Sequence, residues 1–338
     1  MKILLIRFSS LGDVILTTPL VRALRAAYPN AELHFATRPA FAPILASNPR
    51  LDRVLTLQGS DASALARFAK TLRAQHYDHV LDLHGTLRAR ALRVLVPGPR
   101  WRTYPKASLR RRLMVRFPGW ARWKDDVVVP VPERYFGAAR ALDVRPDGLP
   151  PEVFPTDEAR AAAERALAGA GVAPDETIVA IAPGARHRTK CWPEERWAEL
   201  AREIVDRGER PVLLGGPEDA PLARRIADAA PGAVSLAGAL DVLASAAVLA
   251  RARILASGDT GVMHLATATG TPVVALFGPT VRGFGFFPYT DQATILERDL
   301  PQGRDPVVRT FPGRAAGEAA GAGALELLEA ALVGLADA

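Results

Sequence analysis

The chain has almost no cysteine. Cys191 is the single cysteine among 338 residues, which excludes an internal disulfide framework and any metal site built from several cysteines. One free thiol is typical of a protein from a reducing compartment, and we therefore expect a cytoplasmic location.

Long apolar runs are absent as well. Near the N-terminus, four consecutive apolar residues, 3–6, precede Arg7. That is too few for the core of a signal peptide, and nothing farther along approaches the length of a membrane span. We expect no transmembrane helix, so any contact with a membrane would be peripheral.

Several nucleotide and metal motifs are missing. The sequence has no Walker A motif, and no Gly-x-Gly-x-x-Gly follows the first predicted strand, which argues against a kinase and against a dehydrogenase. It also has no Asp-x-Asp pair and no His/Asp cluster with metal-ligand spacing. If the protein binds a diphosphate, Arg, Lys and helix N-termini must neutralise it in place of Mg²⁺. We expect neither a metal nor another cofactor.

The composition is that of an ordinary globular protein, with 49% hydrophobic and 23% charged residues, and the length is enough for two domains. Lys and Arg outnumber Asp and Glu by 43 to 36. Much of the excess lies in residues 100–124, the basic segment, which has no acid and has interleaved aromatic residues. Such a segment attracts an anionic partner. Its cations are Arg100, Arg102, Lys106, Arg110, Arg111, Arg112, Arg116, Arg122 and Lys124.

Short apolar runs alternate with helix-compatible stretches, which predicts an α/β protein with doubly wound parallel sheets. Residues 143–156 contain four prolines and a glycine, a composition typical of an interdomain linker. We expect a first domain at 1–150, a second at 151–314 and a terminal helix at 315–338. The first predicted helix runs to about Tyr28. The predicted strands are 2–6, 32–36, 53–57, 79–83, 177–181, 211–214, 233–236, 253–256 and 272–277.

Polar residues follow the carboxyl ends of many predicted strands, where ligands bind in open α/β sheets. In the first half these residues are Asp13, Asp82, His84 and Arg88. In the second half they are Gly184, Lys190, Gly215, Gly216 and Glu218, together with residues 259–264. We expect all of them to face one cleft between the two domains.

Residues 257–264 form the most distinctive of these strand exits. An apolar run is followed by a turn of small residues, and a helix-compatible stretch then extends to Thr269. A helix N-terminus in that position offers backbone N–H groups and a positive dipole end, which suit a phosphate. Asp259 and Thr260 can cap the helix and still offer oxygens to a ligand, and His264 lies one turn farther on. The alternative is an ordinary N-cap followed by a core histidine.

Three further groups have a chemical interpretation. Arg186, Arg188 and Lys190 would neutralise a diphosphate. Glu218, after a Gly-Gly turn, could accept hydrogen bonds from ribose hydroxyls, or it could be a solvated helix cap. Asp13, near a helix N-terminus, should stay ionised and could take the proton from an attacking hydroxyl, or it could merely cap the helix.

Taken in order, these motifs resemble those of glycosyltransferase family 9, the ADP-heptose:lipopolysaccharide heptosyltransferases, over nearly the whole length. Residues 3–19 look like the opening signature of the family, and 77–85 are similar to its second motif. Residues 182–193 resemble its donor-phosphate loop. The most specific match is 258–266 together with 277–280.

The resemblance implies a GT-B fold, in which two Rossmann-like domains face each other across a cleft. The N-terminal domain would bind the acceptor, the C-terminal domain would bind the nucleotide-sugar, and the terminal helix would pack back toward the first domain. The implied reaction is an inverting, metal-independent transfer of a heptose from ADP-heptose to the lipopolysaccharide inner core.

The resemblance also implies roles for individual residues. Asp13 looks like the catalytic base, and Lys190 like the residue that holds the donor phosphates and stabilises the departing ADP. The implied donor-binding residues are Arg188, Glu218, Asp259, Thr260, Gly261, His264, Gly278 and Thr280. The implied acceptor-binding residues are His84, Arg88, Arg110, Arg111 and Arg112.

The basic segment would meet the carboxylates and phosphates of the lipopolysaccharide core at the inner face of the inner membrane, and we expect no nucleic-acid partner. Other interpretations remain open. They are a GT-B-fold sugar-nucleotide epimerase, a transferase of another nucleotide-sugar onto a cell-envelope glycan, and a protein that binds nucleic acid through the basic segment.

Overall fold

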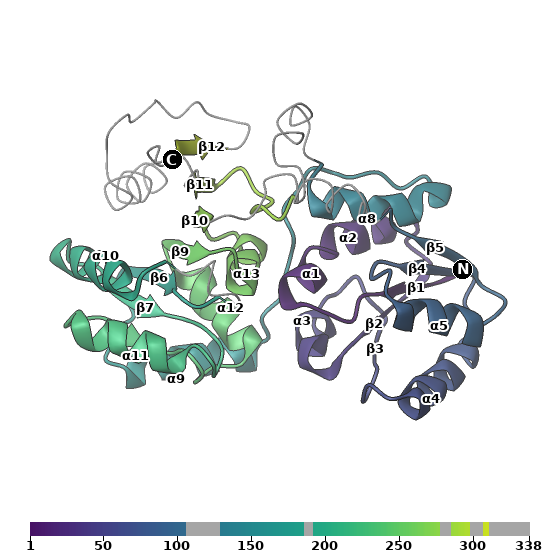
Figure 1. Ribbon diagram of the computed structural model, residues 1–338, viewed down its shortest axis with the longest axis horizontal. Helices are drawn as coiled ribbons and strands as arrows, with labels where there is room; N and C mark the ends of the chain where they lie inside the picture. The colour runs from purple at the N-terminus through teal and green to yellow at the C-terminus, as the bar shows by residue number, and fades with distance from the viewer. Residues whose placement is uncertain (106–128, 186–191, 278–284, 298–306, 311–338) are drawn as a thin grey trace. The chain divides into compact units, whose positions relative to one another are not determined.

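The computed structural model describes residues 1–105, 129–185, 192–277, 285–297 and 307–310. The chain forms two compact units, each built around one sheet (Figure 1). The first unit is Met1–Phe154 with Val281–Phe286, and the second is Pro155–Thr280 with Phe287–Ala338. The predicted terminal helix and the greater part of the basic segment, residues 106–124, lie outside the described residues. No helix in the described ranges is both long and apolar enough to cross a bilayer.

The first unit contains a five-stranded sheet in the order β3-β2-β1-β4-β5, with every pair parallel. The four strands predicted here are present within a residue or two at either end. The fifth, β5, was not predicted, because Trp101 is the one apolar residue among its four and no apolar run marks the strand. The strands are β1 (Lys2–Ile6), β2 (Glu32–Thr37), β3 (Arg53–Thr56), β4 (His79–Asp82) and β5 (Arg100–Thr103).

The predicted first helix is in fact two. The α1 helix ends at Ile15, and α2 begins at Thr18 with Pro19 in its first turn. The break follows from Pro19, which has no N–H to continue the hydrogen bonds of a preceding helix but fits the start of a new one. The unit's helices are α1 (Leu11–Ile15), α2 (Thr18–Ala27), α3 (Ala42–Ala46), α4 (Ala62–Arg73), α5 (Leu87–Leu95) and α8 (Val131–Ala139), with 3-10 turns at Pro39–Phe41 and Arg140–Leu142.

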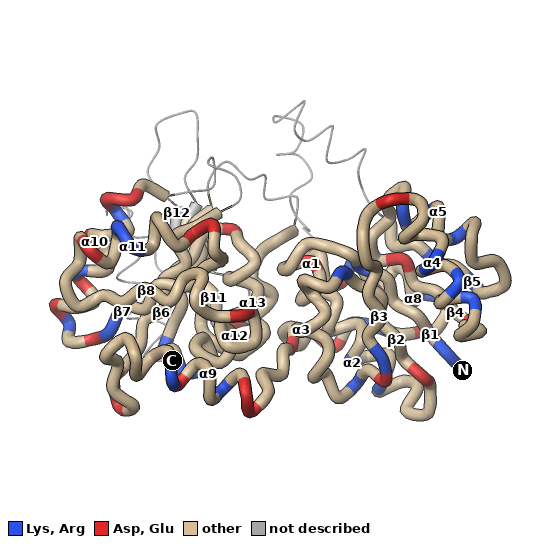
Figure 2. The backbone as a smooth tube through the Cα atoms, turned by 90° about the horizontal axis from the view of Figure 1, so that it is seen from below, with Lys and Arg blue, Asp and Glu red and all other residues tan. Residues whose placement is uncertain are grey.

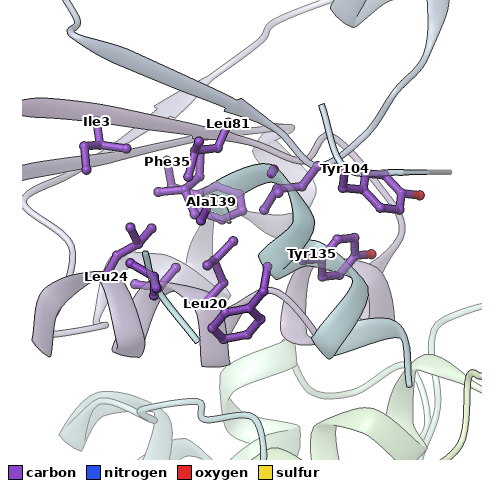
Figure 3. Close-up of a cluster of buried hydrophobic side chains, with 14 of the residues drawn as sticks. Ile3, Leu20, Leu24, Phe35, Leu81, Tyr104, Tyr135 and Ala139 are labelled. Carbon is purple, nitrogen blue, oxygen red and sulfur yellow. The ribbon is translucent and has the colours of Figure 1, made fainter. Parts of the chain in front are cut away.

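Helices cover both faces of this sheet. Because side chains alternate along a strand, Ile3 and Leu5 of β1 face one way and Leu4 and Ile6 the other. The first pair packs with α2 and α8, and Figure 3 shows Ile3 in this cluster with side chains of both helices. The second pair packs with α4 and α5. All four side chains are fully buried, which explains why β1 reads as a continuous apolar run.

The proline-rich stretch predicted as a linker is held against the first unit. The guanidinium of Arg22 in α2 donates to Asp147 (2.7 and 2.9 Å) and to Glu152 (3.2 Å). Arg50 pairs with the other oxygen of Glu152 at 2.5 Å. Residues 147–152 therefore follow the surface of α2 instead of hanging free.

The second unit contains a seven-stranded sheet in the order β12-β11-β10-β9-β6-β7-β8. Its pairs are parallel except for β11 and β12, which are antiparallel. The five strands predicted here are present with small shifts, and β11 and β12 were not predicted because four or five mixed residues give too weak a pattern. The strands are β6 (Ile178–Ala182), β7 (Arg210–Leu213), β8 (Val234–Ser235), β9 (Ile254–Gly258), β10 (Val273–Phe277), β11 (Ala293–Glu297) and β12 (Val307–Thr310). The helices are α9 (Asp157–Gly169), α10 (Glu194–Asp206), α11 (Ala220–Ala229), α12 (Val242–Arg251) and α13 (Gly261–Thr269).

The close approach of α8 to the end of β5 gives a testable prediction. A Cβ added at Gly137 would lie 2.6 Å from Cδ of Pro105, which belongs to a rigid ring. Although alanine favours a helix over glycine, we expect Gly137→Ala to destabilise the protein by about 1–3 kcal/mol in urea unfolding, because of overpacking.

Gly169→Ala in α9 is the matched control. A Cβ there would meet nothing within 4 Å, so the substitution should stabilise by about 0.5–1 kcal/mol. Equal stabilisation by both substitutions would show that α8 does not pack against Pro105.

Candidate functional site

Asp13 lies at the carboxyl edge of the first sheet, in the first turn of α1. Its Oδ2 accepts hydrogen bonds from the backbone N–H of Ser10 at 3.0 Å and from the Ser10 hydroxyl at 2.9 Å. The carboxylate therefore caps α1, as one of the two interpretations predicted. Capping uses one oxygen and leaves Oδ1 for other partners.

That second oxygen pairs with Arg7, the residue that follows β1. The Arg7 guanidinium contacts Oδ1 of Asp13 at 2.6 Å, and it also donates to the carbonyls of Ser9 at 2.8 Å and Leu83 at 2.6 Å. Arg7 is 7% exposed. One buried cation thus ties the end of β1 to the residue after β4 and holds Asp13 in place.

Tyr135 of α8 completes this cluster. Its hydroxyl donates to Oδ1 of Asp13 at 3.4 Å, and the Arg7 guanidinium lies 5.6 Å from the centre of its ring. The ring is fully buried and packs edge-to-face on Tyr104, with centroids 5.1 Å apart. Burial, chiefly, raises the pKa of Tyr135 well above its ordinary value, so the hydroxyl stays a neutral donor.

Asp13 is ionised at neutral pH. Burial alone would raise the pKa of this carboxyl, but the charge of Arg7 and the hydrogen bonds from Ser10 outweigh it, and the pKa lies below its ordinary value. The direction of this shift agrees with the expectation of an ionised Asp13, and the charge of Arg7 is the largest of the causes that lower the pKa. A carboxylate with a lowered pKa is always available to accept a proton but is a weak base.

His84 lies next to this cluster, two residues after β4. The buried carboxylate of Asp82 accepts from the backbone N–H groups of His84 at 2.9 Å and Gly85 at 2.8 Å and so fixes the turn. The Phe8 N–H donates to Nδ1 of His84 at 3.0 Å. Because Nδ1 is the acceptor, the ring carries its proton on Nε2. His84 is partly exposed, as is Arg88, which lies in the first turn of α5.

In the second unit, the predicted strand–turn–helix at 257–269 is present. Thr260 is the N-cap of α13, and its hydroxyl accepts from the backbone N–H of Met263 at 3.3 Å. The first-turn amides of Gly261 and Val262 have no acceptor within the helix. Asp259, Thr260 and Gly261 are partly exposed, so the turn can receive an anion. His264 is 4% exposed and lies on the buried side of α13.

The loops after β6 and β7 meet at Asp219. Its carboxylate accepts from the Gly216 N–H at 2.9 Å, and a Cβ at Gly184 would lie 2.0 Å from its Oδ1. Burial raises the pKa of Asp219, and the charge of Glu218 raises it further. Glu218 itself is exposed. The glycines of both loops thus make room for Asp219, which sequence reasoning did not single out.

Eight of the residues predicted for the site lie outside the part of the chain that the structure describes. They are Arg110, Arg111, Arg112, Arg186, Arg188, Lys190, Gly278 and Thr280. Within the described ranges, His, Cys, Asp and Glu side chains do not gather in groups of three that could hold a metal ion.

The structure therefore brings the predicted residues together in two sets. At the carboxyl edge of the first sheet, Asp13 and His84 are joined by residues 7 and 8. At the carboxyl edge of the second sheet, the loops that contain Gly184, Gly216 and Glu218 touch each other. Thr260 follows β9, the strand next to β6. The first set places an ionised carboxylate and an imidazole at the edge of one sheet, and the second offers backbone amides to an anion.

This chain is similar to proteins of known function. The sequence profile of glycosyltransferase family 9 (heptosyltransferase) matches residues 65–308. Lipopolysaccharide heptosyltransferase 1 of Pseudomonas aeruginosa is 31% identical over 84% of this chain and 80% of its own length. Lipooligosaccharide heptosyltransferase 2 of Haemophilus influenzae is 28% identical over 88% of each chain. The solved structure of Escherichia coli ADP-heptose lipopolysaccharide heptosyltransferase II has a TM-score of 0.74 at 22% identity, over 99% of both chains.

The Arg7–Asp13 pair predicts how the carboxylate titrates. In Arg7→Met the burial of Asp13 remains but its cation is gone, so we expect its pKa to rise from below its ordinary value to above it. Carboxyl NMR of aspartate-labelled protein, with the signal assigned through Asp13→Asn, measures this shift. An unchanged pKa would mean that Arg7 does not control Asp13.

The same pair has a consequence for stability. Because the folded-state pKa of Asp13 is lowered, its ionised form stabilises the fold above the unfolded value of about 4, and this stability is lost as the pH falls through the folded pKa. The advantage of the native protein over Asp13→Asn in unfolding free energy should therefore shrink below pH of about 4.

Proposed function

The chain belongs to glycosyltransferase family 9, and from this membership we propose that it transfers a heptose from ADP-heptose to the inner core of lipopolysaccharide. As a member of this family it is a glycosyltransferase, and its fold is GT-B, with two parallel-sheet α/β units. The observation that carries the proposal is the match to heptosyltransferases that act on lipopolysaccharide or lipooligosaccharide over most of both chains.

Asp13 would be the base of an inverting transfer. Such a reaction needs a group that takes the proton from the acceptor hydroxyl as it attacks the sugar. The ion pair with Arg7 supports this role, since it keeps the carboxylate charged whenever an acceptor arrives. With so weak a base, the proton would move late, once the new C–O bond has made the hydroxyl acidic.

The second unit would hold the donor and stabilise the leaving ADP. We propose that Lys190 and Arg188, together with the amides at the N-terminus of α13, neutralise the diphosphate as its charge develops. Thr260, Gly261 and Asp259 would contact the phosphates and the sugar, with Gly278 and Thr280, and His264 would support the helix from its buried side. Glu218 would contact the ribose. This arrangement requires no metal ion.

The acceptor would be anionic. His84 would contact the acceptor, and Arg88 and the cations at 110–112 would meet its phosphates and carboxylates. We propose that the protein works in the cytoplasm, peripherally at the inner face of the inner membrane, where a lipid-linked acceptor is found.

The base assignment predicts a clean separation of chemistry from binding. Asp13→Ala should lower kcat by about 10²–10⁴-fold, because proton removal is lost, while ADP affinity stays within a few-fold. Product formation by chromatography and the rise in Tm with added ADP measure the two effects.

Asp61→Ala is the control, since Asp61 also caps a helix of the first unit, α4, but is exposed. It should leave kcat unchanged. Near-normal turnover by Asp13→Ala would refute the base assignment. Conversion of the donor when no acceptor is present would identify an epimerase instead.

Metal independence is tested by removing metals. Because cationic side chains and helix amides would neutralise the diphosphate, we expect kcat/KM to be unchanged after extensive dialysis against EDTA. A loss that Mg²⁺ or Mn²⁺ restores would contradict this part of the proposal.

A further inference from the structure

The α5 helix exposes aliphatic side chains to an unusual degree. Six large hydrophobic side chains of the described residues are exposed, and three of them, Leu87, Val94 and Leu95, belong to this one helix of nine residues. Leu87 and Val94 are each 81% exposed. Single exposed aliphatic residues are common, but three on one short helix are not explained by chance exposure.

These side chains lie on a defined face of α5. The helix buries Ala89 and Leu92 against the sheet. Leu87 and Val94 are seven residues apart, so they lie in line on the opposite side, two turns from each other. Arg90 and Arg93, both exposed, lie beside this line. The outward face of α5 therefore has an aliphatic centre with arginines at its flank.

The neighbouring helix α4 extends the positive charge. It packs beside α5 on the same face of the sheet and exposes Arg67, Lys70 and Arg73 at intervals of three (Figures 1 and 2). Neither helix contains Asp or Glu. No ion pair joins these cations, or Arg90 and Arg93, to any residue that the structure describes. We call the outward faces of α4 and α5 the α4–α5 surface.

This combination matches the surface of an anionic bilayer. Aliphatic side chains gain free energy by entering the boundary between head groups and acyl chains, and arginines beside them reach lipid phosphates while their stems stay apolar. Each cation near such a surface adds to the attraction. A nucleic acid would use the cations but would leave Leu87 and Val94 in water.

We propose that the α4–α5 surface docks the protein on anionic phospholipid, with Leu87 and Val94 inserted among the lipids and Arg90, Arg93 and the α4 cations on the head groups. The inference deepens the proposed function, on which it rests for its purpose, because a transferase with a lipid-linked acceptor must reach a membrane. The residues named for this surface belong neither to the basic segment nor to the residues predicted to bind the acceptor.

Flotation of the full chain with vesicles tests this without any substrate, so the result does not depend on whether the reaction is correctly assigned. The vesicles contain equal parts of phosphatidylglycerol and phosphatidylcholine, or phosphatidylcholine alone. We expect binding to the first kind and weak binding to the second. The double variant Arg90→Ser, Arg93→Ser should bind roughly 30-fold more weakly, which corresponds to about 1 kcal/mol for each arginine.

The double variant Leu87→Ser, Val94→Ser should bind about tenfold more weakly. The control is Arg160→Ser, Arg165→Ser in α9, which removes two exposed arginines of the second unit and should change nothing. All these side chains are exposed, so an unchanged Tm confirms that each variant folds.

Three results would overturn the proposal. The first is equal binding to both kinds of vesicle. The second is native binding by both α5 variants, or an equal loss in the α9 control. The third is loss with the arginine pair but not with the aliphatic pair, accompanied by binding of RNA at the same site, which would make this a nucleic-acid surface.

Discussion

The ion pair between Arg7 and Asp13 is the interaction on which the first unit's carboxyl edge depends. It joins the residue after β1 to the first turn of α1, reaches the carbonyl of Leu83 after β4, and lies under the ring of Tyr135 in α8. Removing one partner of such a buried pair typically costs about 3–5 kcal/mol, because the other charge is left without compensation. The geometry of the edge and the charge state of Asp13 therefore have a common origin.

The ion pair with Arg7 keeps Asp13 charged but makes it a weaker base. A free carboxylate in the same half-buried place would have a raised pKa and would be a stronger base, but it would be protonated for part of the time. With Arg7 in place the carboxylate is always charged and held, and its basicity is reduced. Such a group suits a reaction in which the acceptor hydroxyl becomes acidic during attack, and in which most of the barrier is lowered by stabilising the leaving diphosphate.

Much of this sheet edge could be predicted from the sequence. The residues that were missed were missed for physical reasons. Asp13, His84 and Thr260 were found because each lies in the turn or helix start that follows an apolar run, and that signal is local. Arg7 has the same signal but resembles a strand-ending charge of no special role. Tyr135 is 122 residues from Asp13, and no pattern in one sequence joins them. Glu218 was singled out because it follows a Gly-Gly turn and because the family resemblance implies a ribose contact, whereas the glycine loops close around Asp219.

Charged surfaces are also hard to predict from the sequence alone, because basic residues that are consecutive in the sequence need not lie on one surface. In β5 the side chains alternate, so Trp101 packs against the core beneath α5 while Arg100 and Arg102 are exposed. At the start of the basic segment, alternate residues of the strand therefore point to opposite sides, and its aromatic and basic side chains do not share one surface. The cations of α4 and α5 are scattered in the sequence, yet spacings of three on two adjacent helices gather them on one side. Before a binding partner is inferred from charge, the charged residues must first be assigned to the faces of the helix or strand that carries them. Counted in this way, the cations of α4 and α5 face outward, beside Leu87 and Val94.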